Sequence, residues 1–236
     1  MKVEQLRLGG IEIEVTFKAI KNLHLSVHPP EGRVTISSPH FYDLEKVKIY
    51  AATKLGWIKK EQRRFQMQAR EDERLMITRE SHYLFGERYL LEVAEGRRNN
   101  VKLKGKKMIL TVTDTADRDL KRKTLYHFYR RELRKKLEIF IPRYAQNMQV
   151  GAPPVKIRTM KTKWGSCASD QGRLWFNIEL AKKPVACIEY VVVHELVHLL
   201  ERHHNKRFVL LMDRFYPAWR TQKKLLNELP LHSSEA

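Results

Sequence analysis

Residues 190–204 read Tyr-Val-Val-Val-His-Glu-Leu-Val-His-Leu-Leu-Glu-Arg-His-His, and this stretch decides the architecture around it. His194 and His198 stand four residues apart in a helical pattern, so their imidazoles lie on one face, one turn apart. Two histidines and a glutamate buried without partners would destabilise the fold, whereas a bound metal ion removes that cost. The pattern therefore predicts a metal site on a buried helix, surrounded by Val191, Val192, Val193, Leu196, Val197, Leu199 and Leu200.

Glu195 follows the first histidine, which places its carboxylate beside the metal rather than on it. A general base needs that position, because it takes a proton from water that the metal has acidified. Two imidazoles suit zinc, although other divalent ions bind the same ligands. We therefore predict a hydrolase with one Zn²⁺ ion, in which His194 and His198 bind the metal and Glu195 is catalytic.

Catalytic zinc usually has three protein ligands and an open position for water. His203 and His204 are both candidates for the third ligand. A continuing helix would point either side chain away from the shared face, so the chain must leave the helix and turn back. Histidine and asparagine tolerate left-handed backbone, which makes residues 203–205 a credible helix end. Periodicity alone does not choose between the two histidines.

Two blocks of this sequence resemble the YgjP-like family of bacterial metal-dependent hydrolases, which look related to SprT-type and other zincin metallopeptidases. The first block precedes the histidines and the second contains them, so that together they span residues 159–208. The matching residues are Lys163-Trp164-Gly165-Ser166-Cys167, Asn177, Leu180, Pro184, Tyr190 to Leu199, and His204 to Phe208.

The resemblance implies that His204 is the third metal ligand, because the family carries a histidine six residues after the second one. This sequence departs from the family at His203, where asparagine is expected, and at Asn205, where serine is usual. Both replacements keep polar, turn-forming residues. The glycine that metzincins carry in this interval is absent, which disfavours that subgroup.

The substrate is open between two classes. The zincin resemblance implies a peptidase, whereas families grouped with the YgjP-like proteins have also been described as UTP pyrophosphatases. Lys156, Arg158, Lys161 and Lys163 precede the site and could neutralise phosphate oxygens. We expect substrate contacts from Lys161, Lys163, Trp164 and Ser166, and the alternative for Trp164 is a core position beneath the metal helix.

The chain of 236 residues predicts an α+β protein without internal repeats. We expect a β-rich N-terminal part with one long helix over residues 1–115, and a zincin-like hydrolase part over residues 116–236. Pro142 should kink or end a second long helix that begins at Asp117. The expected later elements are strands near 155–163 and 173–177 and helices near 184–202 and 206–226.

The formal net charge of +19 attracts polyanions, so nucleic acid is a candidate partner. Basic runs at 97–98, 102–107, 121–123 and 130–136 would supply phosphate contacts, and a nucleic-acid-binding protein with structural zinc is therefore a third hypothesis. Glu195 would have no purpose in such a site. Two cysteines, no signal peptide and no bilayer-spanning segment predict a cytoplasmic protein with no membrane contact.

Overall fold

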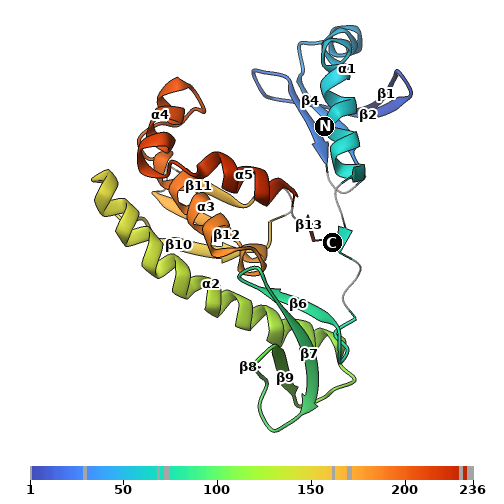
Figure 1. Cartoon of the computed structure of the whole chain (residues 1–236). Helices are drawn as coiled ribbons and strands as arrows, with labels where there is room; N and C mark the ends of the chain where they lie inside the picture. Colours follow the sequence, from blue (N-terminus) through green and yellow to red (C-terminus); the bar gives the residue numbers. More distant parts are fainter. Residues whose placement is uncertain are drawn as a thin grey trace. The chain divides into compact units, whose positions relative to one another are not determined.

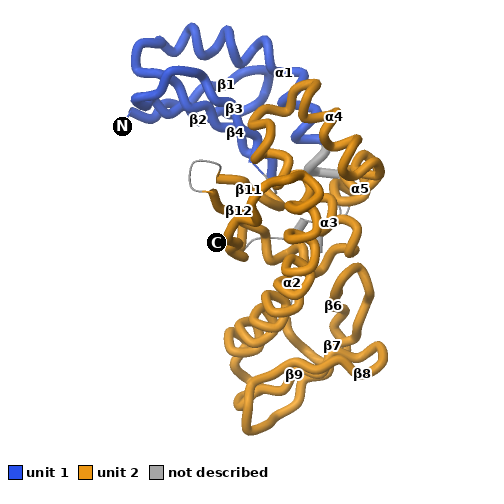
Figure 2. Tube along the Cα trace, turned by 90° about the vertical axis from the view of Figure 1, so that its left-hand side faces the viewer, with its two compact units in different colours: residues 1–70, 233–236 blue, residues 71–232 orange. Residues whose placement is uncertain are grey.

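The computed structural model describes residues 2–28, 31–67, 70–71, 75–160, 163–168, 172–228 and 231–232. Contacts divide the chain into two compact units, one ending at Arg70 and one spanning Glu71–His232 (Figures 1 and 2). The fold class is α+β, as expected, with strands leading and helices following. None of the described helices has the length and apolar character that crossing a bilayer requires.

Unit 1 is a four-stranded sheet with one long helix. The strands are β1 (Lys2–Leu8), β2 (Ile11–Lys18), β3 (His24–His28) and β4 (Arg33–Pro39), in the order β1-β2-β4-β3. Side chains alternate along β2, so that Ile13 and Val15 point to one face of the sheet. There they pack in one core with Val47, Ala51 and Ile58 of helix α1 (Leu44–Met67). This unit contains none of the predicted metal ligands.

Unit 2 begins with a sheet of the same topology. Strands β6 (Ser81–Leu84), β7 (Glu87–Glu95), β8 (Asn100–Lys104) and β9 (Lys107–Val112) take the order β6-β7-β9-β8. In both sheets two hairpins meet through parallel second strands, and a long helix follows. The arrangement thus recurs although the sequence shows no repeat, because turns and alternation set the topology with different residues.

The long helix of unit 2, α2 (Arg118–Met148), passes through Pro142 without ending there. Proline removes one hydrogen bond to the carbonyl four residues earlier, but Ile141, Tyr144 and Ala145 on both sides of it are buried in the core. Of the two expected effects of Pro142, a kink or an early end, the early end is therefore wrong, because core packing on both sides holds the helix together. The helix ends at Met148, and the capping residue Gln149 adopts left-handed backbone with φ of 56°.

The remainder of unit 2 carries the predicted site. Strands β10 (Val155–Arg158), β11 (Gly165–Ala168) and β12 (Arg173–Asn177) form a sheet in the order β10-β12-β11. The 3₁₀ helix η2 (Ile178–Lys182), helix α3 (Val185–Val197), helix α4 (Lys206–Phe215) and helix α5 (Trp219–Glu228) follow. Short strands β5 (Arg70–Glu71) and β13 (Leu231–His232) complete the described elements.

Two expected helices are shorter than predicted. Helix α3 ends at Val197 rather than near 202, and the single helix expected over 206–226 is divided into α4 and α5. Pro217 explains the division, because a proline pushes the preceding residue out of helical backbone. Tyr216 accordingly has φ of −150° and ψ of 75°.

Residues 75–115 belong to the same compact unit as the C-terminal elements, and the contacts divide the chain at Arg70. The tight turn between β6 and β7 contacts η2, where the backbone N–H groups of Phe85 and Gly86 donate to the carbonyls of Ala181 and Lys182 at 2.8 and 3.2 Å. Gly86 has φ of 86°, and a Cβ there would lie 3.0 Å from Pro184. The second sheet therefore supports the segment that leads into α3.

Candidate metal centre

Helix α3 is held in the core of unit 2 on several sides. Val192, Val193, Leu196 and Val197 are fully buried, as the apolar pattern predicts. Helix α2 fixes its orientation through the Tyr144 hydroxyl, which donates to the Glu189 carboxylate at 2.8 Å. The polar residues at the end of α3 thus project from a rigid support.

The chain turns back after α3 and starts α4 at Lys206, eight residues after His198. Asn205 caps α4, because its side-chain oxygen accepts from the backbone N–H of Phe208 at 3.0 Å. The Glu201 carboxylate accepts from the backbone N–H of His203 at 3.1 Å and stabilises the turn. This reversal, which the ligand spacing required, returns His204 to the end of α3.

The ring nitrogens of His194, His198 and His204 converge, with the candidate ligand atoms all within 4.8 Å of one another. The Nε2 atoms of His194 and His204 are 3.2 Å apart. Two nitrogens bound to one tetrahedral zinc at about 2.0–2.1 Å would be separated by about 3.3 Å. The donor set and its spacing therefore fit one divalent ion. The structure brings His204, and not His203, into this cluster.

The environment favours neutral imidazoles at the cluster. Burial lowers the pKa of His194 to about 3, and the neighbouring His198, His204 and Lys223 act in the same direction. Burial also lowers the pKa of His198 and of His204. Because only the deprotonated nitrogen binds a metal, these shifts prepare the cluster for an ion.

Two contacts fix the orientation of the rings. The Nδ1 atom of His198 lies 3.1 Å from the backbone carbonyl of Glu201; a carbonyl can only accept, so this nitrogen carries the proton and Nε2 is left for a metal. The buried ring of Phe208 lies between 4.6 and 5.0 Å from all three imidazole centroids. Phe208 therefore forms an apolar floor beneath the cluster.

Glu195 is on α3, its side chain lies against Gly165 of β11, and it is 5% exposed. A Cβ on Gly165 would stand 2.7 Å from both Cγ and Oε1 of Glu195, so only glycine fits against this carboxylate. Burial raises the pKa of Glu195 to about 8, opposed by the Lys163 charge and a hydrogen bond from the backbone N–H of Cys167. The carboxyl group is thus poised to exchange a proton near neutral pH.

The other predicted contact residues do not share one location. Lys163 influences Glu195 directly, and Trp164 packs against the core with the Lys183 ammonium 5.5 Å from its ring. Ser166 alternates with Gly165 and Cys167 along β11, so it points to the opposite face from Glu195. Lys161 lies outside the described residues.

Sequence reasoning missed Lys223 on α5, whose charge acts on His194 and His204. No local signal marks it, because it follows His204 by 19 residues on a separate helix. Cys167 lies close to Glu195. Burial raises the pKa of the Cys167 thiol, and the negative charge of Glu195 raises it further. A raised pKa disfavours the thiolate, which is the form of cysteine that acts as a nucleophile or binds a metal.

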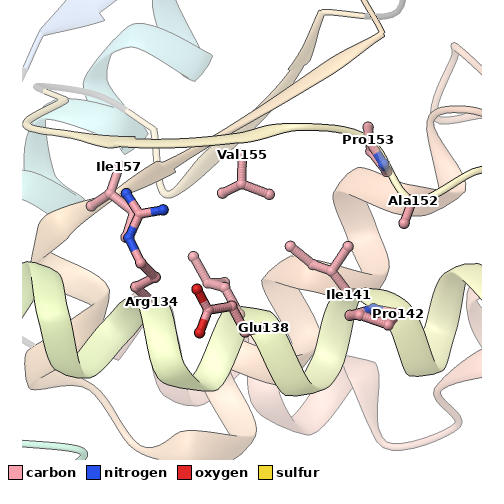
Figure 3. A pocket seen from close by; sticks show the side chains of 9 residues that line it. Arg134, Glu138, Ile141, Pro142, Ala152, Pro153, Val155 and Ile157 are labelled. Carbon is pink, nitrogen blue, oxygen red and sulfur yellow. The ribbon is translucent and has the colours of Figure 1, made fainter.

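A pocket of about 210 Å³ lies elsewhere in unit 2, between α2 and β10 (Figure 3). Its lining is mostly apolar, with Arg134 and Glu138 as the charged residues. The three clustered histidines, Glu195 and Lys223 are not among the residues that line it. The pocket is therefore separate from the metal cluster.

A family model described as the YgjP-like metallopeptidase domain matches residues 21–229 of this chain. No curated protein matches it. Two similar solved structures are metallopeptidase zymogens, jannalysin from Methanocaldococcus jannaschii at 14% identity and abylysin from Pyrococcus abyssi at 17%. They cover 38% and 40% of this chain and 92% and 99% of their own, each with a TM-score of 0.35.

Proposed function

The chain belongs to the YgjP-like family of metallopeptidase domains, and from this premise we propose that it is a zinc-dependent peptidase. His194, His198 and His204 would hold the ion, and Glu195 would be the general base. One observation carries the proposal: three imidazoles with lowered pKa values converge at the end of α3, the helix that also carries the Glu195 carboxylate, which is 5% exposed. A structural zinc site has no use for such a group, and usually contains cysteine ligands.

A bound zinc ion would supply Lewis acidity, which polarises a carbonyl oxygen and acidifies water. The chain supplies the proton transfers. The Glu195 carboxylate takes the proton from the attacking water and delivers it to the nitrogen of the departing amine. Gly165 and the backbone N–H of Cys167 hold that carboxylate in place. Burial raises its pKa, so that the carboxylate can hold the proton before it passes it to the amine.

UTP pyrophosphatase activity is a second candidate, supported by two cations. The charge of Lys163 acts on Glu195, and that of Lys223 acts on His194 and His204. Both fit an anionic substrate, whether a triphosphate or an acidic peptide. Lys156 and Arg158 would not contribute, because alternation along β10 turns them to the face opposite Glu195.

The deciding experiment compares two substrates on the zinc-loaded protein. Peptide release from a fluorescently labelled unfolded protein is measured beside pyrophosphate release from UTP, each with the Glu195→Gln variant as background. Peptide release that is lost in the variant supports the peptidase. Glu195-dependent pyrophosphate release without peptide release would overturn the proposal in favour of the second candidate.

Substitution of Gly165 by alanine should lower turnover by about 10²-fold. The added methyl group would overlap the Glu195 side chain and displace its carboxylate. Zinc content should stay unchanged, since no ligand is touched. Gly151→Ala is the matched control, because a Cβ there meets nothing within 4 Å. Full turnover in Gly165→Ala would show that Glu195 does not need its observed position.

A further inference from the structure

The sheet β10-β12-β11 presents two different faces. Leu174 and Phe176 point into the core, and Gly165 and Cys167 point toward Glu195. Alternation sends the intervening side chains to the opposite face, where Trp175 pairs in register with Lys156 on one side and Ser166 on the other. The side chains on this outward face, which we call the basic face, are Lys156, Arg158, Ser166, Ala168, Arg173 and Trp175.

The centre of the basic face is a stacked pair. The guanidinium carbon of Arg158 lies 3.4 Å from the centroid of the Trp175 ring. Arg158 is exposed while Trp175 beneath it is half-buried, and the indole Nε1 has no hydrogen-bond partner among the described residues. The ring therefore holds the guanidinium flat against the sheet, and the outer surface of that planar cation is open to solvent.

The charge of the basic face is of one sign. The three strands contain no aspartate or glutamate, while Lys156, Arg158 and Arg173 are cationic. Two further arginines lie beside the edge strand β10. The Arg130 guanidinium donates to the carbonyl of Ile157. Arg134 lines the pocket together with Ile157 (Figure 3). Glu138, one turn beyond Arg134, is the acidic residue of that pocket.

We propose that the basic face binds single-stranded nucleic acid, a function separate from peptide hydrolysis. An unstacked base can stack on the flat guanidinium of Arg158, and the surrounding cations can contact the phosphates on either side of it. A single strand offers such bases, whereas a duplex keeps them paired and stacked. The net charge of +19 would add long-range attraction to this local recognition.

The first test separates stacking from charge by measuring how a fluorescently labelled single strand of about 12 nucleotides binds the full-length protein. Arg158→Lys keeps the charge but removes the planar surface, and we expect it to weaken binding by about 10-fold. Arg158 is exposed, so the substitution leaves the core intact. Equal binding by wild type and Arg158→Lys would overturn the proposal.

A matched pair of double variants tests the location. Lys156→Ala with Arg158→Ala should weaken binding by more than about 10-fold and lower the slope of log affinity against log salt by about 1.4. Lys102→Ala with Lys104→Ala removes the same charge from exposed positions of β8 and should change affinity by less than about 3-fold. Equal losses in both variants would overturn the assignment to this face.

Polyglutamate provides the last arm, because it is a polyanion without bases. Single-stranded nucleic acid should displace the labelled strand at a far lower charge concentration than polyglutamate does. Equal competition would show that any acidic polymer suffices and would overturn the nucleic-acid proposal. Peptidase activity enters none of these readouts, so they do not depend on the proposed catalytic function.

Discussion

Replacing Glu195 with glutamine is expected to lower turnover by about 10²–10⁴-fold, the range that general acid–base catalysis contributes. Glutamine has nearly the same size and can still accept the hydrogen bond from the backbone N–H of Cys167. It cannot take a proton from water or return one to a leaving group. The rate should be measured with the zinc-loaded variant on whichever substrate the wild-type protein cleaves.

Zinc content and thermal unfolding provide the controls for this variant. Both should match the wild-type protein, because Glu195 is not among the converging ring nitrogens and its amide replacement needs no ionisation in a buried position. A variant that retains zinc and full turnover would show that another group moves the proton. Lost zinc would instead place Glu195 on the metal.

Replacing His204 with alanine is expected to weaken zinc affinity by more than about 100-fold, since even the partners of ligating residues contribute 10–100-fold. The three-ligand set would be reduced to the two histidines of α3. Zinc affinity is measured by competition with a chromophoric chelator. His204 is exposed, so the loss of its ring should affect metal binding much more than folding.

His203→Ala is the matched control, one residue away on the same turn. His203 contributes its backbone N–H to the Glu201 carboxylate, and its ring is absent from the described cluster. This variant should therefore keep wild-type zinc affinity. The reverse result, with His203→Ala losing zinc and His204→Ala keeping it, would transfer the ligand role to His203.

Apolar periodicity predicted much of the fold. The α+β class, the long helix from Asp117 and the buried helix with His194 and His198 are all confirmed. Strand β11 was not predicted, because Gly165-Ser166-Cys167-Ala168 has little β-propensity and pairs only through its position beside β12. The division between α4 and α5 was missed although Pro217 marks it in the sequence.

Helix geometry alone placed His194, Glu195 and His198 near one another. Their spacing fixes the relation before any tertiary contact forms, because one helical turn separates the two imidazoles. The third ligand did not follow from periodicity. The family resemblance supplied His204 as an expectation, and its ligand role is a prediction that the zinc measurements above test.

The sequence by itself determined which helix would be buried and which side chains it would carry to one face. Only the tertiary structure decided what surrounds them: Gly165 against Glu195, Phe208 beneath the imidazoles, and Lys223 beside the cluster. It also separated Arg158 from Lys163, although they are five residues apart. Arg158 stacks on Trp175 on the basic face, whereas the charge of Lys163 acts on Glu195. The physical reason is range: helical and strand periodicity act over a few residues, whereas these contacts depend on how distant segments pack.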